Sequence, residues 1–229
     1  MPFITPTFDE WVEYCFTLGA SDFKNCHETE ALDRSIRYTE FPIDTLAAYL
    51  VRLFSQPEDL VNKYSDDQFA EAVWFLFGEG GGCWQLLYHS KELSVASKHN
   101  CLRSLIPCYT QLFDKICCNR GKDPHADRAW TSAAELDGAV YMIWDMSGVD
   151  LFAGKAEYRD TVFAVLDAIL TQCRTSTCWI SALHGLGHLQ LDLEHEERVR
   201  TIIDKFLKRP KLPDFIREYA LAAREGAVQ

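Results

Sequence analysis

Apolar residues recur at intervals of three and four along most of this chain, and this periodicity limits the folds that it can adopt. In F-P-I-D-T-L-A-A-Y-L-V-R-L-F (residues 41–54), the apolar side chains at 43, 46, 47, 50, 53 and 54 form one stripe. The same spacing recurs at 157–174 and at 199–207. A helix brings such positions to one face, whereas a strand needs strict alternation, which no useful length of this sequence shows. The sequence therefore predicts an all-α protein of roughly ten helices without a sheet.

Turn signals divide the predicted helices. G-E-G-G-G (78–82) follows one apolar helical segment, and R-P-K-L-P-D (209–214) separates the last two helices. Ser94 or Ser97 is placed to begin a long helix, which we expect Pro107 to kink. The polar loop N-R-G-K-D-P-H-A-D (119–127) is the best candidate for a boundary inside the chain. We expect a single all-helical domain over 1–229, with 119–127 as its possible sub-boundary.

Three segments resemble one another: A-V-W-F-L-F-G (72–78), A-V-Y-M-I-W-D (139–145) and A-L-H-G-L-G-H (182–188). The last two begin 43 residues apart, which is within the period of two-helix HEAT-type repeats, whereas the first two begin 67 apart, which is not. This irregular internal repeat favours stacked antiparallel helix pairs, that is, a HEAT-like α-solenoid with unequal units.

A resemblance to a known group of proteins points the same way. S-A-L-H-G-L-G-H-L (Ser181–Leu189) looks like helices of bacterial HEAT-like proteins, and R-P-K-L-P-D-F-I-R-E-Y-A-L-A-A-R-E-G (209–226) resembles their closing helices. Several such proteins are immunity proteins that neutralise polymorphic toxins. The resemblance covers about 50 residues. Because proteins of one fold can have different functions, the resemblance implies the helix packing and does not by itself imply an activity.

His184 and His188 are four residues apart, so on a helix they share a face and could hold one metal ion with Glu194. The zinc-protease pattern needs a glutamate directly after the first histidine, and Gly185 stands there instead. The alternative is tight packing, in which the glycines let a neighbouring helix approach and each histidine bonds to a carbonyl or carboxylate. We expect packing, with a metal-dependent enzyme as the alternative, and we expect no cofactor.

Two further motifs have a stronger structural explanation than a functional one. G-E-G-G-G precedes a helix but lacks the lysine and hydroxyl of a phosphate-binding loop, so we expect a helix–helix turn. Cys83 has His89 and His99 nearby in the sequence, yet nine cysteines and seven histidines produce such neighbours by chance. We therefore expect no catalytic residues.

The charge of the chain selects among partners. Its formal net charge is −11, and because residues 196–229 carry eight basic and six acidic side chains, residues 1–195 carry −13. Such a surface repels phosphate backbones, so we expect no nucleic-acid partner and favour a basic protein, such as a toxin with a cationic cleft. Aromatic and polar side chains could contact it, although core packing is the default for any aromatic; the candidates are Trp84, Tyr88, Asp137, Tyr141, Trp144, Asp145, His184 and His188.

The cysteines and the apolar segments indicate the compartment. The nine cysteines stand mostly in apolar helical stretches without a C-x-x-C pair, as expected of reduced core residues. The longest apolar stretch, Ala72–Tyr88, contains Glu79 and four glycines, which argues against a membrane span. The first residues lack the pattern of a secretory signal, so we expect a cytoplasmic protein with no membrane partner. The sequence favours a non-catalytic, protein-binding helical-repeat protein, with a general scaffold or adaptor as another alternative.

Overall fold

The structure, a computed structural model, describes residues 5–78, 81–118, 132–192 and 194–228. Within these ranges the chain is helical and contains no strand, which confirms the predicted all-α class. The first part contains α1 (Phe8–Thr17), α2 (Gly19–Lys24), α3 (Thr29–Thr39), α4 (Ile43–Ser55), α5 (Asp66–Phe77), α6 (Cys83–His89), α7 (Val95–Pro107) and α8 (Asp114–Ile116). The second part contains α9 (Ser132–Tyr141), α10 (Ile143–Ser147), α11 (Ala156–Gln172), α12 (Ser176–Gln190), α13 (Glu196–Leu207) and α14 (Asp214–Arg224). Two short 3₁₀ turns lie between helices: η1 (Pro57–Leu60) follows α4, and η3 (Asp150–Gly154) follows α10.

The described residues form more helical segments than the roughly ten expected, and the long helix predicted after Ser94 is one that is interrupted. Ser94 starts α7, since its hydroxyl oxygen accepts a hydrogen bond from the Ser97 N–H at 3.1 Å. Pro107 has no N–H to continue the ladder, and the chain widens after it into the π-helical stretch Cys108–Phe113 (η2) before the single turn of α8. The disturbance expected at Pro107 is therefore a change of helical pitch.

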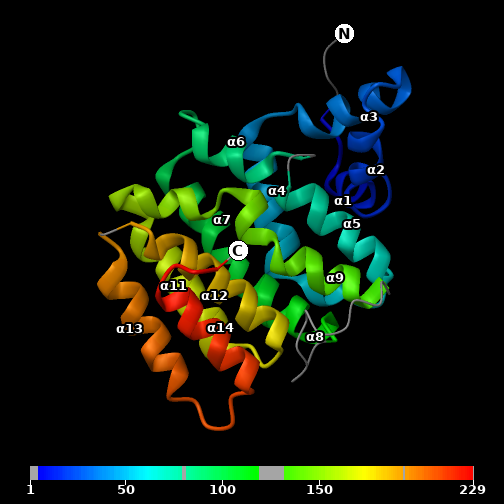
Figure 1. Ribbon diagram of the computed structural model, residues 1–229. Helices are drawn as coiled ribbons and strands as arrows, with labels where there is room; N and C mark the ends of the chain where they lie inside the picture. The colour runs from blue at the N-terminus through cyan, green and yellow to red at the C-terminus, as the bar shows by residue number, and fades with distance from the viewer. Residues whose placement is uncertain (1–4, 79–80, 119–131, 193, 229) are drawn as a thin grey trace.

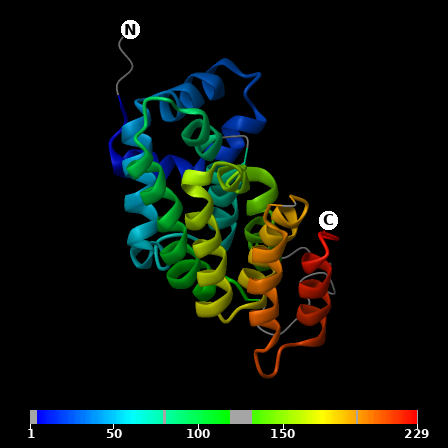
Figure 2. The same cartoon turned by 90° about the vertical axis from the view of Figure 1, so that its left-hand side faces the viewer.

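The helices stack so that the N-terminal and C-terminal elements lie at opposite ends of the molecule. Figures 1 and 2 show α1–α3 (blue) at one end and α13 and α14 (orange and red) at the other. Helix α12 lies between them and packs against α9, α11 and α14. Other neighbours are distant in the sequence, since α4 packs against α7 and α5 against α9. The stacked antiparallel helix pairs of a HEAT-like solenoid therefore remain a prediction.

One contiguous core of buried side chains joins both parts of the chain. It includes large aromatic residues from each part, among them Trp11, Phe75, Trp84, Trp144 and Phe163. Seven of the nine cysteines are buried in it, and Cys26 and Cys118 are exposed. The prediction that cysteines serve as small core residues holds for those seven. The possible sub-boundary at 119–127 lies outside the described residues.

None of the described helices combines the length and the apolar character that crossing a bilayer requires.

Helix α12 packs so closely that it needs both of its glycines. A Cβ atom on Gly185 would lie 2.6 Å from the indole ring of Trp144, and one on Gly187 would lie 2.3 Å from the side chain of Val228. Both distances are too short for a real contact, so the glycines make room for neighbours, as the packing interpretation expected. The neighbours are two side chains, one from α10 and one from the segment after α14.

We expect Gly185→Ala to destabilise the protein by about 1–3 kcal/mol, because the new methyl group collides with a buried indole that has little space to move. Urea unfolding measures this loss. Gly138→Ala is the matched control, because Gly138 is also helical but a Cβ there meets nothing within 4 Å. That variant should gain up to about 1 kcal/mol from helix propensity. Equal stability of the two variants would contradict the close contact.

Candidate functional site

Two histidines of α12 and one aspartate of α10 converge between these helices, where His188 and Asp145 are partly exposed to solvent. The Nε2 atom of His184 lies 2.9 Å from Oδ2 of Asp145, and the Nε2 atom of His188 lies 3.2 Å from Oδ1 of the same carboxylate. One ligand atom from each of the three side chains falls within 4.8 Å of the others. Among the described residues this is one of two groups with donor atoms close enough to share a metal ion. We call these three residues the His–Asp cluster.

Each histidine ring also faces a polar side chain with its other nitrogen. The Nδ1 atom of His184 lies 2.6 Å from the hydroxyl of Tyr219 on α14, which in turn donates to the hydroxyl of Tyr141 at 3.2 Å. The Nδ1 atom of His188 faces Oδ2 of Asp150, in η3, at 3.7 Å. Both rings therefore direct Nε2 toward Asp145 and Nδ1 toward an outer partner.

Burial differs across the cluster. The His184 side chain is fully buried, whereas the side chains of His188 and Asp145 are 26% and 31% exposed. The neighbouring carboxylates, Asp150 first and then Asp145, raise the pKa of His188 despite its partial burial. The cluster thus stabilises positive charge at a place that solvent can reach, which suits either a protonated imidazole or a cation.

Asp145, and not Glu194, is the carboxylate beside the two histidines. Glu194 forms an ion pair with Arg159 at 2.8 Å and supplies no atom to the cluster. In the alternative metal-binding interpretation, the ligand set of His184, His188 and Glu194 is therefore corrected to His184, His188 and Asp145. Sequence proximity favoured Glu194, whereas the chain brings α10 to α12 from about forty residues earlier.

Two of the expected partner-binding residues are core residues. Trp84 is 1% exposed and its ring stacks with those of Phe54 and Phe77, at centroid separations of 6.5 and 5.8 Å. Trp144 is also 1% exposed and lies against Gly185. Their expected role as interface anchors is corrected, because a ring buried between helices cannot contact a partner without unfolding its surroundings.

Tyr88 and Tyr141 are half-buried and already have partners. The ring of Tyr88 contacts that of Phe152 edge-on, and the ammonium group of Lys155 lies 4.0 Å from its centroid. Tyr141 contacts the ring of His184 at 4.8 Å between centroids. Of the eight residues expected to bind a partner, the structure brings Tyr141, Asp145, His184 and His188 together around one polar site, with Trp144 beneath it.

Asp137 is buried away from this site, which corrects its expected role as a contact to a partner. It is 8% exposed and lies near Cys117 and Thr177. Burial raises the pKa of its carboxyl group, although hydrogen bonds from these neighbours act in the opposite direction.

The second group with ligand-like spacing contains Asp114, Cys173 and Cys178. Oδ1 of Asp114 accepts hydrogen bonds from the N–H groups of Arg174 and Thr175, both at 2.7 Å, and from the Thr175 hydroxyl at 2.9 Å. These residues precede the first turn of α12, where a carboxylate also complements the helix dipole. The position of Asp114 is therefore explained by a structural role, in which its carboxylate accepts hydrogen bonds at the start of α12.

The Cys83 thiol is also held in the core. It is 3% exposed, and burial raises the pKa of the thiol to about 12. Its possible partner His99 lies 2.8 Å from the Thr161 hydroxyl. Because the thiolate is the nucleophile, such a thiol has little reactivity at neutral pH.

The glycine-rich turn at 78–82 lies partly outside the described residues, since 79–80 are not among them. Its described end leads directly into α6, which begins at Cys83 after Gly82 in the left-handed backbone region, with a φ of 53°. A glycine is favoured there because it lacks a Cβ atom.

We expect Asp137→Asn to raise the melting temperature at pH 7. The raised pKa of Asp137 means that the folded state binds its proton more tightly than the unfolded state does. The protonated Asp137 carboxyl therefore contributes stability to the folded state below the ordinary carboxyl pKa of about 4. This contribution is lost as the pH rises through the pKa of Asp137 in the folded state. At pH 7 the buried charge is therefore unfavourable, and the neutral amide removes it.

Thermal unfolding of the variant and the unchanged protein at pH 4 and pH 7 tests this difference. The gain should be present at pH 7 and shrink at pH 4, while the exposed-site control Asp33→Asn should change little at either pH. A loss of stability at pH 7 would mean that the hydrogen bonds of Asp137 outweigh its burial.

No protein-family model, curated protein or solved structure matches the chain. The resemblance of Ser181–Leu189 and of 209–226 to bacterial HEAT-like proteins therefore stays a prediction. What the His–Asp cluster can do follows from its own distances, burial and charges: two imidazole nitrogens and a carboxylate can hold a proton or a cation at a solvent-accessible point.

Proposed function

We propose that this chain is a non-catalytic binding protein that occupies a cationic protein partner, most specifically an immunity protein that neutralises a bacterial toxin. The observation that carries the proposal is the uneven distribution of charge over the fold. Residues 5–78 contain fourteen acidic and five basic side chains, a net charge of −9 out of the −11 of the whole chain. These residues form α1–α5, and α1–α3 make up one end of the molecule (Figures 1 and 2).

The same end of the molecule exposes apolar side chains. Leu18, Phe23 and Leu32, which are 40–42% exposed, lie within or between α1, α2 and α3. Exposed apolar groups rimmed by polar side chains can form a protein-binding surface, in which the apolar groups contribute affinity and the charges select the partner. Residues 8–39, which span α1–α3, contain seven acidic and three basic side chains, and we refer to these three helices as the acidic end.

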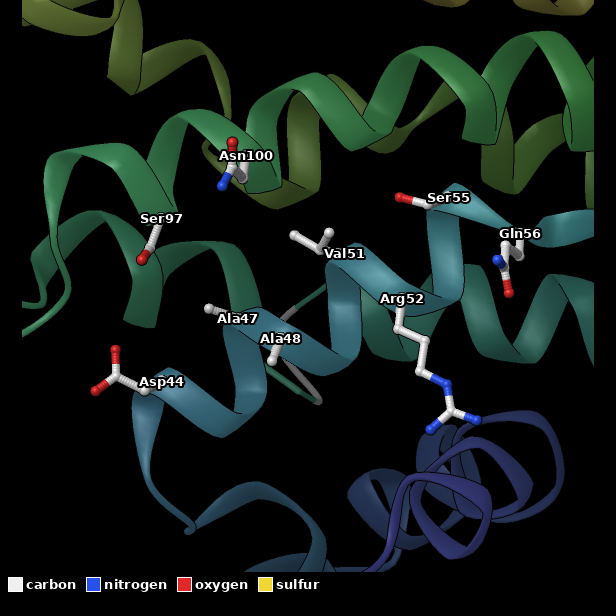
Figure 3. A pocket seen from close by; sticks show the side chains of 9 residues that line it. All are labelled: Asp44, Ala47, Ala48, Val51, Arg52, Ser55, Gln56, Ser97 and Asn100. Carbon is white, nitrogen blue, oxygen red and sulfur yellow. The ribbon is translucent and has the colours of Figure 1, made fainter.

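A depression beside the acidic end could receive a side chain of the partner. It is an open depression of about 670 Å³ between α4 and α7, lined by Ala47, Val51, Ser97 and Asn100 among others. Figure 3 shows Asp44 at one side of it and Arg52 extending from α4 toward the N-terminal helices. The Arg52 guanidinium lies 3.8 Å from the centroid of the Phe8 ring, so its charge is already engaged. A long basic side chain of a partner could lie in this depression with Asp44 at its rim.

The physical logic is electrostatic steering. A toxin that acts on nucleic acid or nucleotides needs a basic cleft, and an anionic surface would be attracted to it and could close it to its substrate. This logic agrees with what the resemblance to HEAT-like immunity proteins implies. It also explains the function without a chemical step on this chain.

The test begins with capture of the partner from the source organism and reconstitution of the two purified proteins. We expect a one-to-one complex whose Kd weakens as salt rises, and a partner whose activity falls in the complex. Co-expression should restore growth to cells that make the partner. A complex that leaves the partner fully active would indicate a general scaffold or adaptor instead.

Paired variants test whether the acidic end makes the contact. Leu32→Ser with Asp33→Lys changes one exposed apolar and one exposed acidic residue of α3, and should weaken binding about 10-fold or more. Leu221→Ser with Glu218→Lys makes the same kind of change on exposed residues of α14, at the opposite end, and should leave the Kd unchanged. Equal Kd values for both pairs, or a salt-independent complex, would contradict the proposal.

The convergence of His184, His188 and Asp145 favours a second candidate, a metal-dependent enzyme. Such an enzyme requires a bound metal ion, so absence of metal binding at the cluster would exclude this candidate.

A further inference from the structure

We infer that Asp145, His184 and His188 form a binding site for one divalent transition-metal ion of the zinc class. This inference stands independently of the proposed function, because a metal ion can support a binding surface as well as a reaction. It rests on the geometry of the donor atoms, on their outer partners, on their charge and on their access to solvent.

The donor atoms lie close to the separation that a shared ion requires. Two ligands at about 2.1 Å from one tetrahedral ion lie about 3.4 Å apart. The Nε2 atoms of His184 and His188 lie 2.9 and 3.2 Å from the two carboxylate oxygens of Asp145, and the donors all fall within 4.8 Å of one another. Slight opening of this triangle places the ion between them.

The outer partners match those of known metal sites in kind. A metal-bound histidine commonly has its second ring nitrogen held by a carboxylate, a carbonyl or another polar group, which fixes the direction of the coordinating lone pair. Here Nδ1 of His184 lies 2.6 Å from the Tyr219 hydroxyl and Nδ1 of His188 lies 3.7 Å from Asp150. Both rings are oriented from outside so that Nε2 points to the same place.

The charge of the cluster also suits a divalent cation. Asp145 and Asp150 bring two carboxylates to two imidazoles, so with neutral rings the group carries two negative charges, which one divalent ion neutralises. Nitrogen and oxygen donors without a thiolate favour zinc and its neighbours in the first transition row over calcium or magnesium.

The location permits an ion to enter and leaves a coordination position open. His184 is anchored in the core, whereas Asp145 and His188 are about one quarter to one third exposed. Three protein ligands leave a fourth tetrahedral position for water or for a donor group of another molecule. Since Asp145 belongs to α10 and the histidines to α12, the ion would also join these two helices.

The test uses the full chain with Cys26→Ser and Cys118→Ser, which removes the exposed thiols that could bind the probe metals. After treatment with a chelator, calorimetric titration with Zn²⁺ should give one ion per chain. Co²⁺ should give the visible spectrum of a four- or five-coordinate ion without a thiolate charge-transfer band. Zn²⁺ should also raise the melting temperature.

Single variants assign the ligands. Asp145→Asn and His188→Gln should each weaken Zn²⁺ affinity by about 100-fold or more, and Asp150→Asn by about 10-fold because it only orients His188. His89→Gln, which changes an exposed histidine on α6, should bind as the unchanged protein does. Circular dichroism of each metal-free variant checks folding, and we avoid His184 because its complete burial links it to stability.

Two results would overturn the inference. One is the failure of Zn²⁺ and Co²⁺ to bind stoichiometrically at micromolar concentrations, which would leave the cluster as an ion-paired histidine network. The other is undiminished binding by Asp145→Asn and His188→Gln, which would place the metal elsewhere. Neither result bears on the acidic end, so failure here and failure of the proposed function are distinguishable.

Discussion

The burial of helix α12 is the constraint on which the rest of the structure depends. Almost every side chain from Ser176 to Gln190 is buried, and neighbouring helices surround it. A helix enclosed in this way can tolerate few bulky groups, so Gly185 and Gly187 allow Trp144 and Val228 to approach it. Its polar side chains must find partners inside the protein, because they have little access to water.

This requirement explains why the polar site is where it is. His184, with no exposure, has Tyr219 on one ring nitrogen and Asp145 near the other. The partners come from α14 and α10, so the same contacts hold three helices together. Packing and a functional site are therefore not alternatives at this place, since the packing supplies the oriented rings that a metal site needs.

The molecule separates its charged surface from this site. Most of the net negative charge belongs to residues 5–78, whereas the His–Asp cluster lies among α10, α12 and η3. A partner attracted to the acidic end and an ion held by the cluster would use different elements of one contiguous core. The two proposals can thus both hold, and neither requires the other.

By itself the sequence determined the helical class, the start of α7 at Ser94 and the shared face of His184 and His188, because these depend on local spacing and on capping side chains. The glycines of α12 indicated close packing for the same reason. Only the tertiary structure decided that Trp84, Trp144 and Asp137 are buried, and that Asp145 and not Glu194 faces the histidines. Burial and long-range neighbours depend on how helices cross, and a periodic pattern identifies the apolar face of a helix without identifying what packs against it. That is why Glu194, which follows the histidines closely in the sequence, lies away from them, whereas Asp145 on another helix lies beside them.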